Sequence, residues 1–180
     1  MDLSFVKNAF GDAHPCVGMV DHGSRVCTRL AALANKTSWS LLGHLCFAIA
    51  KHGKPKAIRV DNEIIFNSFV FRTFLKLVGI KKQSIPKAAP WCNGKIERFF
   101  GSLKSATKNL IIPNKQALQK ALNEWVFFYN HVRPHQHLNG LTPIEAQQGL
   151  TPTDIQHMPI QSATPITALD GEVGGYHLRR

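Results

Sequence analysis

The strongest constraint on the fold is a change of hydrophobic period along the chain. The first 34 residues hold three short runs that favour β-strands, whereas apolar residues recur at helical spacing from Ser38 onward. The predicted strands are 3–6, 16–20, 26–30, 57–60 and 80–85, and the predicted helices are 38–51, 68–78, 93–110, 114–130 and a short one from 142. Three sequential antiparallel strands followed by βα units predict a mixed sheet with helices packed on its faces.

The length and composition favour one compact domain with an attached segment. The chain has 180 residues, of which 44% are hydrophobic, so it can bury a core. After Gly149 the sequence is rich in Pro, Thr and Gly and loses its hydrophobic period. We therefore expect a domain over 1–150 and a mostly extended C-terminal tail over 151–180.

The charge of the chain predicts a polyanionic partner. The formal net charge is +11, and each Lys or Arg placed on a nucleic-acid phosphate releases a condensed counterion. The 4 cysteines include no C-x-x-C pair, which is typical of buried thiols in a reducing compartment. The sequence begins without a signal-peptide pattern, and the apolar stretch at 41–50 is too short to span a bilayer. We expect a cytoplasmic protein with no membrane partner.

Three carboxylates stand at the ends of predicted elements. Asp2 begins the first strand, Asp61 ends the strand at 57–60, and Glu97 lies in the first turn of the helix that follows Asn93. If they converge, they form an oxygen cluster suited to Mg²⁺ or Mn²⁺. Two such ions can activate a water or a 3′-hydroxyl and stabilise the leaving oxygen in phosphodiester cleavage. The alternative is that the three acids have unrelated structural roles. Asp2 would belong to a disordered terminus, Asp61 would favour a turn, and Glu97 would interact with the dipole at the N-terminus of its helix.

An ordered set of motifs covers most of the chain. These are VDNE at 60–63 with Phe66, PWCNGKIERFF at 90–100 with Leu103 and Lys104, VDHGSR at 20–25, YNHVRPH at 129–135 and LTPIEA at 141–146. Together they resemble the DDE-type transposases of insertion sequences and the related retroviral-type integrases. Asp61 and Glu97 are separated by 35 residues, which is the separation that defines this family.

The resemblance implies a fold, an activity and a site. The fold would be an α/β, RNase H-like core with a mixed five-stranded sheet and helices on both faces. The activity would be metal-dependent DNA strand cleavage and strand transfer in transposition, with one or two Mg²⁺ or Mn²⁺ ions bound by the catalytic residues Asp2, Asp61 and Glu97. The partners would be mobile-element ends and target DNA, and we also expect a homo-oligomer, at least a dimer.

The first acid of this triad has two rivals. Asp21 corresponds to a family aspartate that stabilises the early hairpin, and Asp12 lies in a predicted turn. Glu63 stands where relatives often have glycine, and we interpret it as a solvated turn residue or an auxiliary charge. Relatives also carry an N-terminal helical DNA-binding region, so the resemblance leads us to expect a fragment or a remnant of a mobile-element protein.

Several lysines are candidates for DNA binding. Lys104 follows Glu97 by seven residues and therefore shares its helix face, and Lys108 lies one turn further on. The remaining candidates flank the loop before that helix: Lys81, Lys82 and Lys87. The alternative for each is a solvated surface charge.

Two further questions stay open at this point. The histidine cluster of His131, His135 and His137 is a weak zinc candidate, because no cysteine lies near it, and we expect this segment to pack against the core. The function is either strand cleavage and transfer, cleavage alone by a nuclease of the same fold, or DNA binding and dimerisation by a catalytically inactive module.

Overall fold

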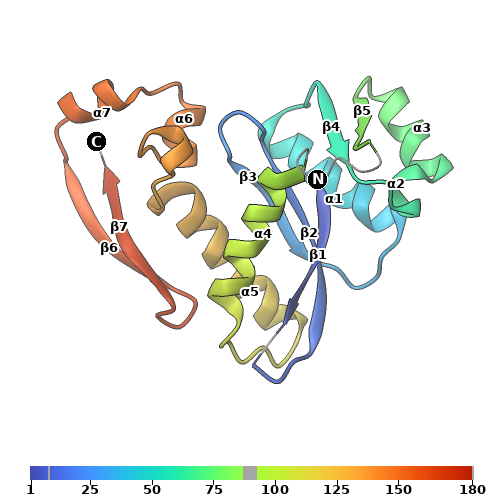
Figure 1. The fold of residues 1–180 in the computed structure, drawn as a ribbon, viewed down its shortest axis with the longest axis horizontal. Helices are drawn as coiled ribbons and strands as arrows, with labels where there is room; N and C mark the ends of the chain where they lie inside the picture. The colour runs from blue at the N-terminus through green and yellow to red at the C-terminus, as the bar shows by residue number, and fades with distance from the viewer. Residues whose placement is uncertain (8, 87–92, 180) are drawn as a thin grey trace.

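The computed structural model of the protein describes residues 1–7, 9–86 and 93–179. The elements follow one another in nearly the predicted order, with short helices added (Figure 1). They are β1 (Asp2–Lys7), β2 (Ala13–Val20), β3 (Cys27–Ala32), α1 (Ser38–His52), β4 (Ala57–Val60), α2 (Ile64–Asn67), α3 (Phe69–Leu77), β5 (Lys81–Ser84), α4 (Gly94–Thr107), α5 (Lys115–Phe127), η2 (Phe128–Val132), η3 (Gln136–Leu138), α6 (Pro143–Gln147), α7 (Pro152–His157), β6 (Ser162–Ala168) and β7 (Val173–Arg179).

The predicted five-stranded sheet is divided in two. Strands β1, β2 and β3 form an antiparallel sheet, and β4 pairs with β5 in a separate parallel sheet. At the junction, the Met1 amino group donates a hydrogen bond to the Arg59 carbonyl over 3.0 Å. No ladder joins β1 to β4 within the described residues. Because β4 and β5 have only four residues each, they offer few groups for a continuous ladder.

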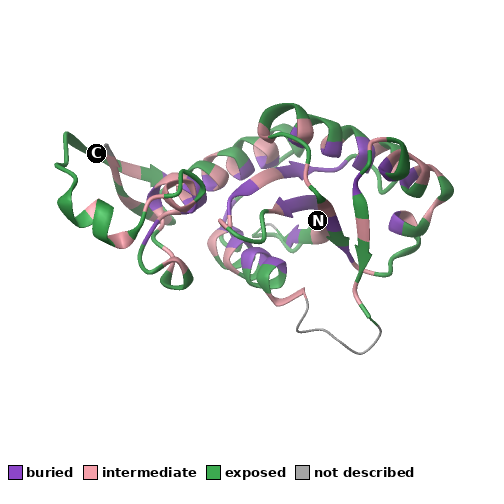
Figure 2. Ribbon diagram, turned by 90° about the horizontal axis from the view of Figure 1, so that it is seen from above, coloured by how far each residue is buried: buried purple, intermediate pink, exposed green. Residues whose placement is uncertain are grey.

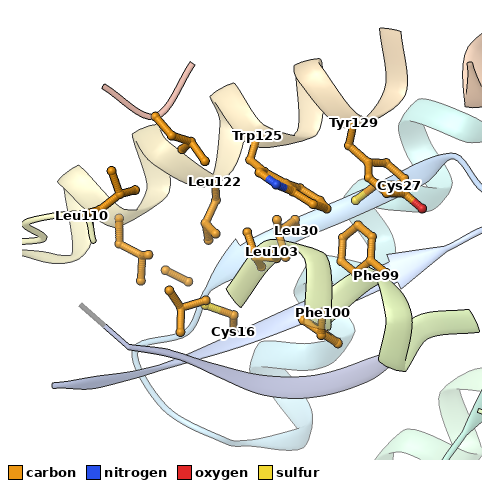
Figure 3. Packing of buried hydrophobic residues seen from close by; sticks show 14 of the residues in the cluster. Cys16, Cys27, Leu30, Phe99, Phe100, Leu103, Leu110, Leu122, Trp125 and Tyr129 are labelled. Carbon is orange, nitrogen blue, oxygen red and sulfur yellow. The ribbon is translucent and has the colours of Figure 1, made fainter. Parts of the chain in front are cut away.

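Helices cover both faces of the three-stranded sheet, as predicted. The side chains of β2 alternate, so that Cys16 enters a core with α4 and α5 while Val17 enters a second core with α1 and α3. Burial is concentrated in the strands and the inward faces of these helices (Figure 2). Figure 3 shows the first core, where side chains from α4 and α5 meet above the strands.

The position of α4 depends on a glycine in β2. A Cβ atom on Gly18 would lie 2.6 Å from Cζ of Phe100, so only glycine allows this helix to approach so closely. The neighbouring Phe99 ring packs edge-on against Trp125 at 4.9 Å and Tyr129 at 5.1 Å between ring centroids. One turn of α4 is thus held by the sheet below it and by α5 and η2 above it.

The Tyr-Asn motif completes this core. The backbone turns into a π-helix at η2, where the Arg133 amide bonds to the carbonyl of Phe128. The side chain of Asn130 accepts a hydrogen bond from the Cys27 amide at 2.8 Å and donates one to the Cys27 carbonyl at 3.0 Å. Asn130 therefore acts as a strand partner at the start of β3, which explains its place in a buried position.

The segment expected to be a mostly extended tail contains helix α7 and an antiparallel hairpin of β6 and β7. Its turn contains Asp170 and Gly171, both with positive φ, a hairpin signal that the sequence analysis did not use. The hairpin packs on the core, because Leu169 is 1% exposed and its amide donates to the Glu124 carboxylate at 3.1 Å. The predicted capping box at Thr142 and Glu145 is present.

No helix among the described residues is both long and apolar enough to cross a bilayer.

The close approach at Gly18 predicts a contrast between two glycine substitutions. Gly18→Ala should lower the free energy of unfolding by about 1–3 kcal/mol, because the new methyl group meets the packed rings of Phe99 and Phe100. Gly43→Ala is the matched control, since a Cβ there meets open space on α1 and should stabilise the helix by up to about 1 kcal/mol. Urea unfolding of both variants measures the difference; equal effects would contradict the account.

Candidate active site

Asp2 lies at the sheet edge beneath the start of α4. It pairs with Gly18 in the ladder of β1 and β2. One carboxylate oxygen accepts a hydrogen bond from the Leu3 amide at 2.8 Å, and the other accepts one from the Asn93 side-chain amide at 3.1 Å. Asp2 thus joins the first strand to the segment that enters α4, although 91 residues separate it from Asn93.

Asp61 follows directly after β4, and its charge reaches Asp2. Burial raises the pKa of Asp2; the hydrogen bond from Leu3 opposes this rise, and the nearby charge of Asp61 adds to it. Asp61 itself accepts a hydrogen bond from the Glu63 amide at 3.1 Å, in a turn that leads into α2. Two carboxylates from separate sheets therefore lie close enough to repel one another.

Glu97 occupies the first turn of α4 and is exposed. Asn93 occupies the N-cap position of α4, but its side chain makes no cap hydrogen bond, and its amide group donates to Asp2. Glu97 follows Asn93 by four residues, so both side chains lie on the same face of the helical turn. Asn93 contacts Asp2, and the approach of Glu97 to the two aspartates stays a prediction.

The three carboxylates do not form one compact group in this conformation. Across 1–7, 9–86 and 93–179, no three His, Cys, Asp or Glu side chains are arranged so that they could hold one metal ion. Asp2 accepts hydrogen bonds from Leu3 and Asn93, and Asp61 accepts one from the Glu63 amide. The assignment of the triad to metal binding stays a prediction.

The two rivals of Asp2 differ from it in their contacts, although Asp21 lines a cleft together with Met1 and Asn93. One oxygen of Asp21 accepts hydrogen bonds from the Gly23 amide at 3.0 Å, the Ser24 amide at 2.8 Å and the Ser24 hydroxyl at 2.9 Å. Burial favours a higher pKa for Asp21, but these hydrogen bonds outweigh it and lower the pKa. Asp12 precedes β2 at the far end of the hairpin from Asp2, roughly 17 Å along the strand.

The predicted lysines are spread over several surfaces. Lys104 is exposed on α4 beyond Glu97, as expected, whereas Lys108 is exposed just after the helix, which ends at Thr107 instead of continuing to 110. Lys82 donates to the Asn67 side chain at the end of α2, so it is already engaged, and Lys81 is exposed. Lys87 lies outside the described residues. The role of each lysine in DNA binding stays a prediction.

The histidines of the YNHVRPH segment pack against aromatic rings. His131 stacks on Phe127 with centroids 4.9 Å apart, and His135 meets the edge of Tyr129 at 4.7 Å. Burial, with a contribution from the charge of Arg133, lowers the pKa of His135 to about 4. The imidazole is therefore neutral at physiological pH.

A cleft of about 480 Å³ opens beside Met1 and Asn93, the neighbours of Asp2, and contains residues that the sequence analysis missed. Its lining includes Met1, Arg59, Asn93 and Lys95. The Lys95 ammonium group donates to the His22 carbonyl at 3.0 Å, which ties α4 to the turn between β2 and β3. Lys95 stands two residues before Glu97 within the third acidic motif, so its position in that motif was the available signal.

Known sequences resemble parts of this chain. A family model described as an integrase core domain matches residues 78–143. The ORF3 protein of Spiroplasma virus SpV1-C74, whose name suggests an integrase, is 38% identical over 97 residues, covering 52% of this chain and 26% of that protein. An uncharacterised 39.2 kDa protein of insertion element IS476 from Xanthomonas euvesicatoria is 26% identical over 146 residues, covering 79% of this chain and 42% of that protein. The chain thus spans less than half the length of either relative.

Solved structures share the fold. In the simian T-cell lymphotropic virus intasome with the PP2A regulatory subunit B56 gamma, a chain aligns at a TM-score of 0.71 and 23% identity, over 93% of this chain and 58% of that one. The HTLV-2 integrase catalytic core domain in complex with magnesium aligns at 0.64 and 23% identity, over 80% and 90%. These likenesses confirm the resemblance to transposases and retroviral-type integrases and the RNase H-like α/β class, whereas the five-stranded sheet is divided here.

The lowered pKa of Asp21 predicts a pH-dependent effect on stability. The ionised carboxylate stabilises the fold at pH values above its usual pKa of about 3.9, and this contribution is lost as the pH falls through the lower pKa of the folded state. Asp21→Asn should therefore be less stable than the wild type at pH 7 and should approach it near pH 2.5. Urea unfolding at both pH values tests this, and a difference that does not change with pH would contradict it.

Proposed function

We propose that this chain is the catalytic core of a polynucleotidyl transferase that cuts and joins DNA strands, with Asp2, Asp61 and Glu97 as the catalytic residues. The observation that carries the proposal is the hydrogen bond between Asn93 and Asp2. It joins the strand that bears one predicted catalytic acid to the helix that bears another. The ordered motifs and the likeness to integrase cores support the same assignment.

The donor set suits a divalent cation. The charge of Asp61 contributes to the raised pKa of Asp2, and a hard cation bound by both carboxylates would offset that effect. Asp2, Asp61 and Glu97 would hold one or two Mg²⁺ or Mn²⁺ ions, and the relative from HTLV-2 is described with magnesium. When bound, the ions would stabilise charge on the attacking and leaving oxygens of a phosphodiester.

The residues of the chain itself would position these groups and the DNA. Asn93 would hold the carboxylate of Asp2 in a fixed orientation through its amide. Lys104, two turns beyond Glu97 on α4, would contact a phosphate next to the scissile bond, and Lys108 would contact the next part of the backbone. Lys81, Lys82 and Lys87 are weaker candidates for such contacts. The DNA would be a mobile-element end and its target, which are acted on in transposition in the cytoplasm.

A homo-oligomer, at least a dimer, is part of the proposal. Helix α1 carries an exposed apolar face, because Trp39 is 72% exposed and Phe47 is 65% exposed. Gly43 lies between them at a spacing of four residues, so all three share one side of the helix. A flat aromatic face of this kind is suited to contact with a second copy. Related integrase cores are described in dimeric and trimeric forms.

Plasmid nicking in Mn²⁺ tests the catalytic assignment. Asp2→Asn, Asp61→Asn and Glu97→Gln should each lower the nicking rate by at least about a hundredfold. The reason is that loss of a metal ligand weakens metal binding and with it the stabilisation of negative charge in the transition state. Glu63→Gln is the matched control, since it removes a neighbouring exposed charge and should leave the rate nearly unchanged. Nicking by Glu97→Gln at the wild-type rate would contradict the assignment.

The control reactions separate the remaining functions. A labelled donor end incubated with a target duplex distinguishes strand transfer from nuclease activity alone. Absence of nicking by the wild type, with DNA binding retained, would favour a catalytically inactive DNA-binding or dimerising module.

Metal linkage gives an independent test. Millimolar Mn²⁺ should raise the melting temperature of the wild type, because a ligand that binds only the folded state stabilises it by mass action, by about 2.7 kcal/mol at a hundred times its Kd. Asp61→Asn should lose most of this rise, whereas Asp21→Asn should keep it, because Asp21 is engaged in its own turn. A thermal scan that gives the same rise in both variants would count against the metal site.

A further inference from the structure

A second cleft lies on the other side of α4 and is lined by cations. Its volume is about 540 Å³, and residues from three separate parts of the chain meet there. Arg25 comes from the β2–β3 connection, Lys95 and Arg98 come from the first turns of α4, and Arg133 follows η2. No Asp or Glu is among the described residues that line it.

The backbone has an unusual conformation in two of the three contributing segments. Arg25 has a φ of 67°, a left-handed conformation that costs a residue with a side chain roughly 1–2 kcal/mol. Arg133 follows the π-helical turn, whose extra residue shifts the direction in which the chain leaves α5. Such conformations persist where the surrounding structure holds them, and they often occur at functional sites. Here both of them bring a guanidinium group to the same cleft.

Beside the larger effect of burial, the arginines of this cleft act to lower the pKa values of two neighbouring side chains, Tyr129 and His135. Burial raises the pKa of Tyr129 to about 12, and Arg133 and Arg25 both oppose that rise. The same two arginines oppose the protonation of His135. The described residues contain one salt bridge, between Lys120 and Glu124 on the solvent side of α5, so no carboxylate there neutralises Arg25, Arg98 or Arg133 through such a bridge.

The ring of His135 leaves one further group unsatisfied. Its Nε2 atom is out of contact with solvent and has no hydrogen-bond partner within the described part of the chain. A buried polar atom without a partner is uncommon in a folded protein and calls for an explanation. Tyr129, Arg133 and His135 all belong to the YNHVRPH motif, and only the aromatic ring of the first is needed by the core.

The cleft and the carboxylates lie on different faces of one helix. Gly94, Arg98 and Ser102 follow one another at intervals of four residues and line the cleft. Asn93 and Glu97 have the same interval but are displaced by one residue, which places their face about 100° away around the helix axis. A DNA strand that crosses the first turns of α4 would therefore contact both faces, which lie within one helix diameter, roughly 10 Å, of each other.

We propose that this cleft, formed by Arg25, Arg98 and Arg133, binds a backbone phosphate of the DNA strand whose scissile phosphate lies at the carboxylates. The guanidinium group presents a planar fork of donors that matches two phosphate oxygens, and a nucleic acid supplies phosphates at regular spacing along one strand. This inference rests on the proposed function, because it names a second contact for the same substrate. The cleft gives affinity and register without sequence information.

Duplex binding across a salt series tests the inference. The probe is the full chain with a short fluorescein-labelled duplex of arbitrary sequence, measured by anisotropy. Arg98→Ala and Arg133→Ala should each weaken binding and lower the log–log salt slope by about 0.9, the value for one phosphate contact. Arg72→Ala is the matched control, because Arg72 is an exposed arginine on α3 and does not line the cleft.

A variant that adds a negative charge to the cleft tests the inference without removing an arginine, whose loss could destabilise the fold. Ser102→Glu adds an acid to the lining without removing a cation, and it should weaken duplex binding while urea unfolding shows a wild-type midpoint. All three cleft variants should raise the DNA concentration needed for half-maximal nicking and leave the rate at saturating DNA unchanged. Binding and salt slopes that differ from wild type no more than those of Arg72→Ala would overturn the inference.

Nicking by Glu97→Gln and duplex binding by the cleft variants together distinguish a failure of this inference from a failure of the proposed function. If Glu97→Gln nicks DNA at the wild-type rate, the catalytic assignment fails, and duplex binding still decides whether the cleft holds a phosphate. If Glu97→Gln is inactive but the cleft variants bind DNA normally, the catalytic assignment stands and the cleft has no role in DNA binding.

Discussion

The packing of Phe100 against Gly18 is the contact on which the candidate site depends. Gly18 pairs with Asp2 across the sheet, so the place where α4 comes closest to the strands is also the place where the first predicted catalytic acid lies. Asn93, at the start of α4, donates a hydrogen bond to the Asp2 carboxylate close to this contact. The adjacent Phe99 fixes the same helix turn against α5 and η2. A small change at Gly18 therefore alters the relation of the carboxylates as well as the core.

Charge divides α4 into two working faces. The segment before Glu97 contacts Asp2 through Asn93, and the face that bears Arg98 lines a cleft of cations. The chain has a net charge of +11, but that excess is not spread evenly around this helix. A rigid helix with Glu97 on one face and Arg98 on another would let a single strand of DNA be held on one side and presented to metal ions on the other. Lys95 lies between the two clefts and lines both of them.

The sequence predicted features that depend on local pattern. The hydrophobic period placed the strands of the first hairpins and the long helices, and the capping pattern at Thr142 predicted α6 correctly. The hydrogen bonds of Asp21 agree with its expected role in the hairpin. Features that depend on distant contacts were missed. Asn93 binds Asp2 from 91 residues away instead of capping its own helix, and the hairpin of β6 and β7 depends on burial of Leu169 against α5. The cationic cleft joins three segments that no single motif brings together.

The arrangement of the acids around α4 is tested most directly by a crystal structure of the wild type soaked in Mn²⁺, with the ion located by its anomalous scattering. The account predicts a peak bonded to carboxylate oxygens of Asp2, Asp61 and Glu97 at about 2.1 Å, with Phe100 still packed on Gly18. A Mn²⁺ peak held elsewhere, or one bound by the aspartates while Glu97 faces solvent, would contradict the claim that α4 carries the third acid of a metal site.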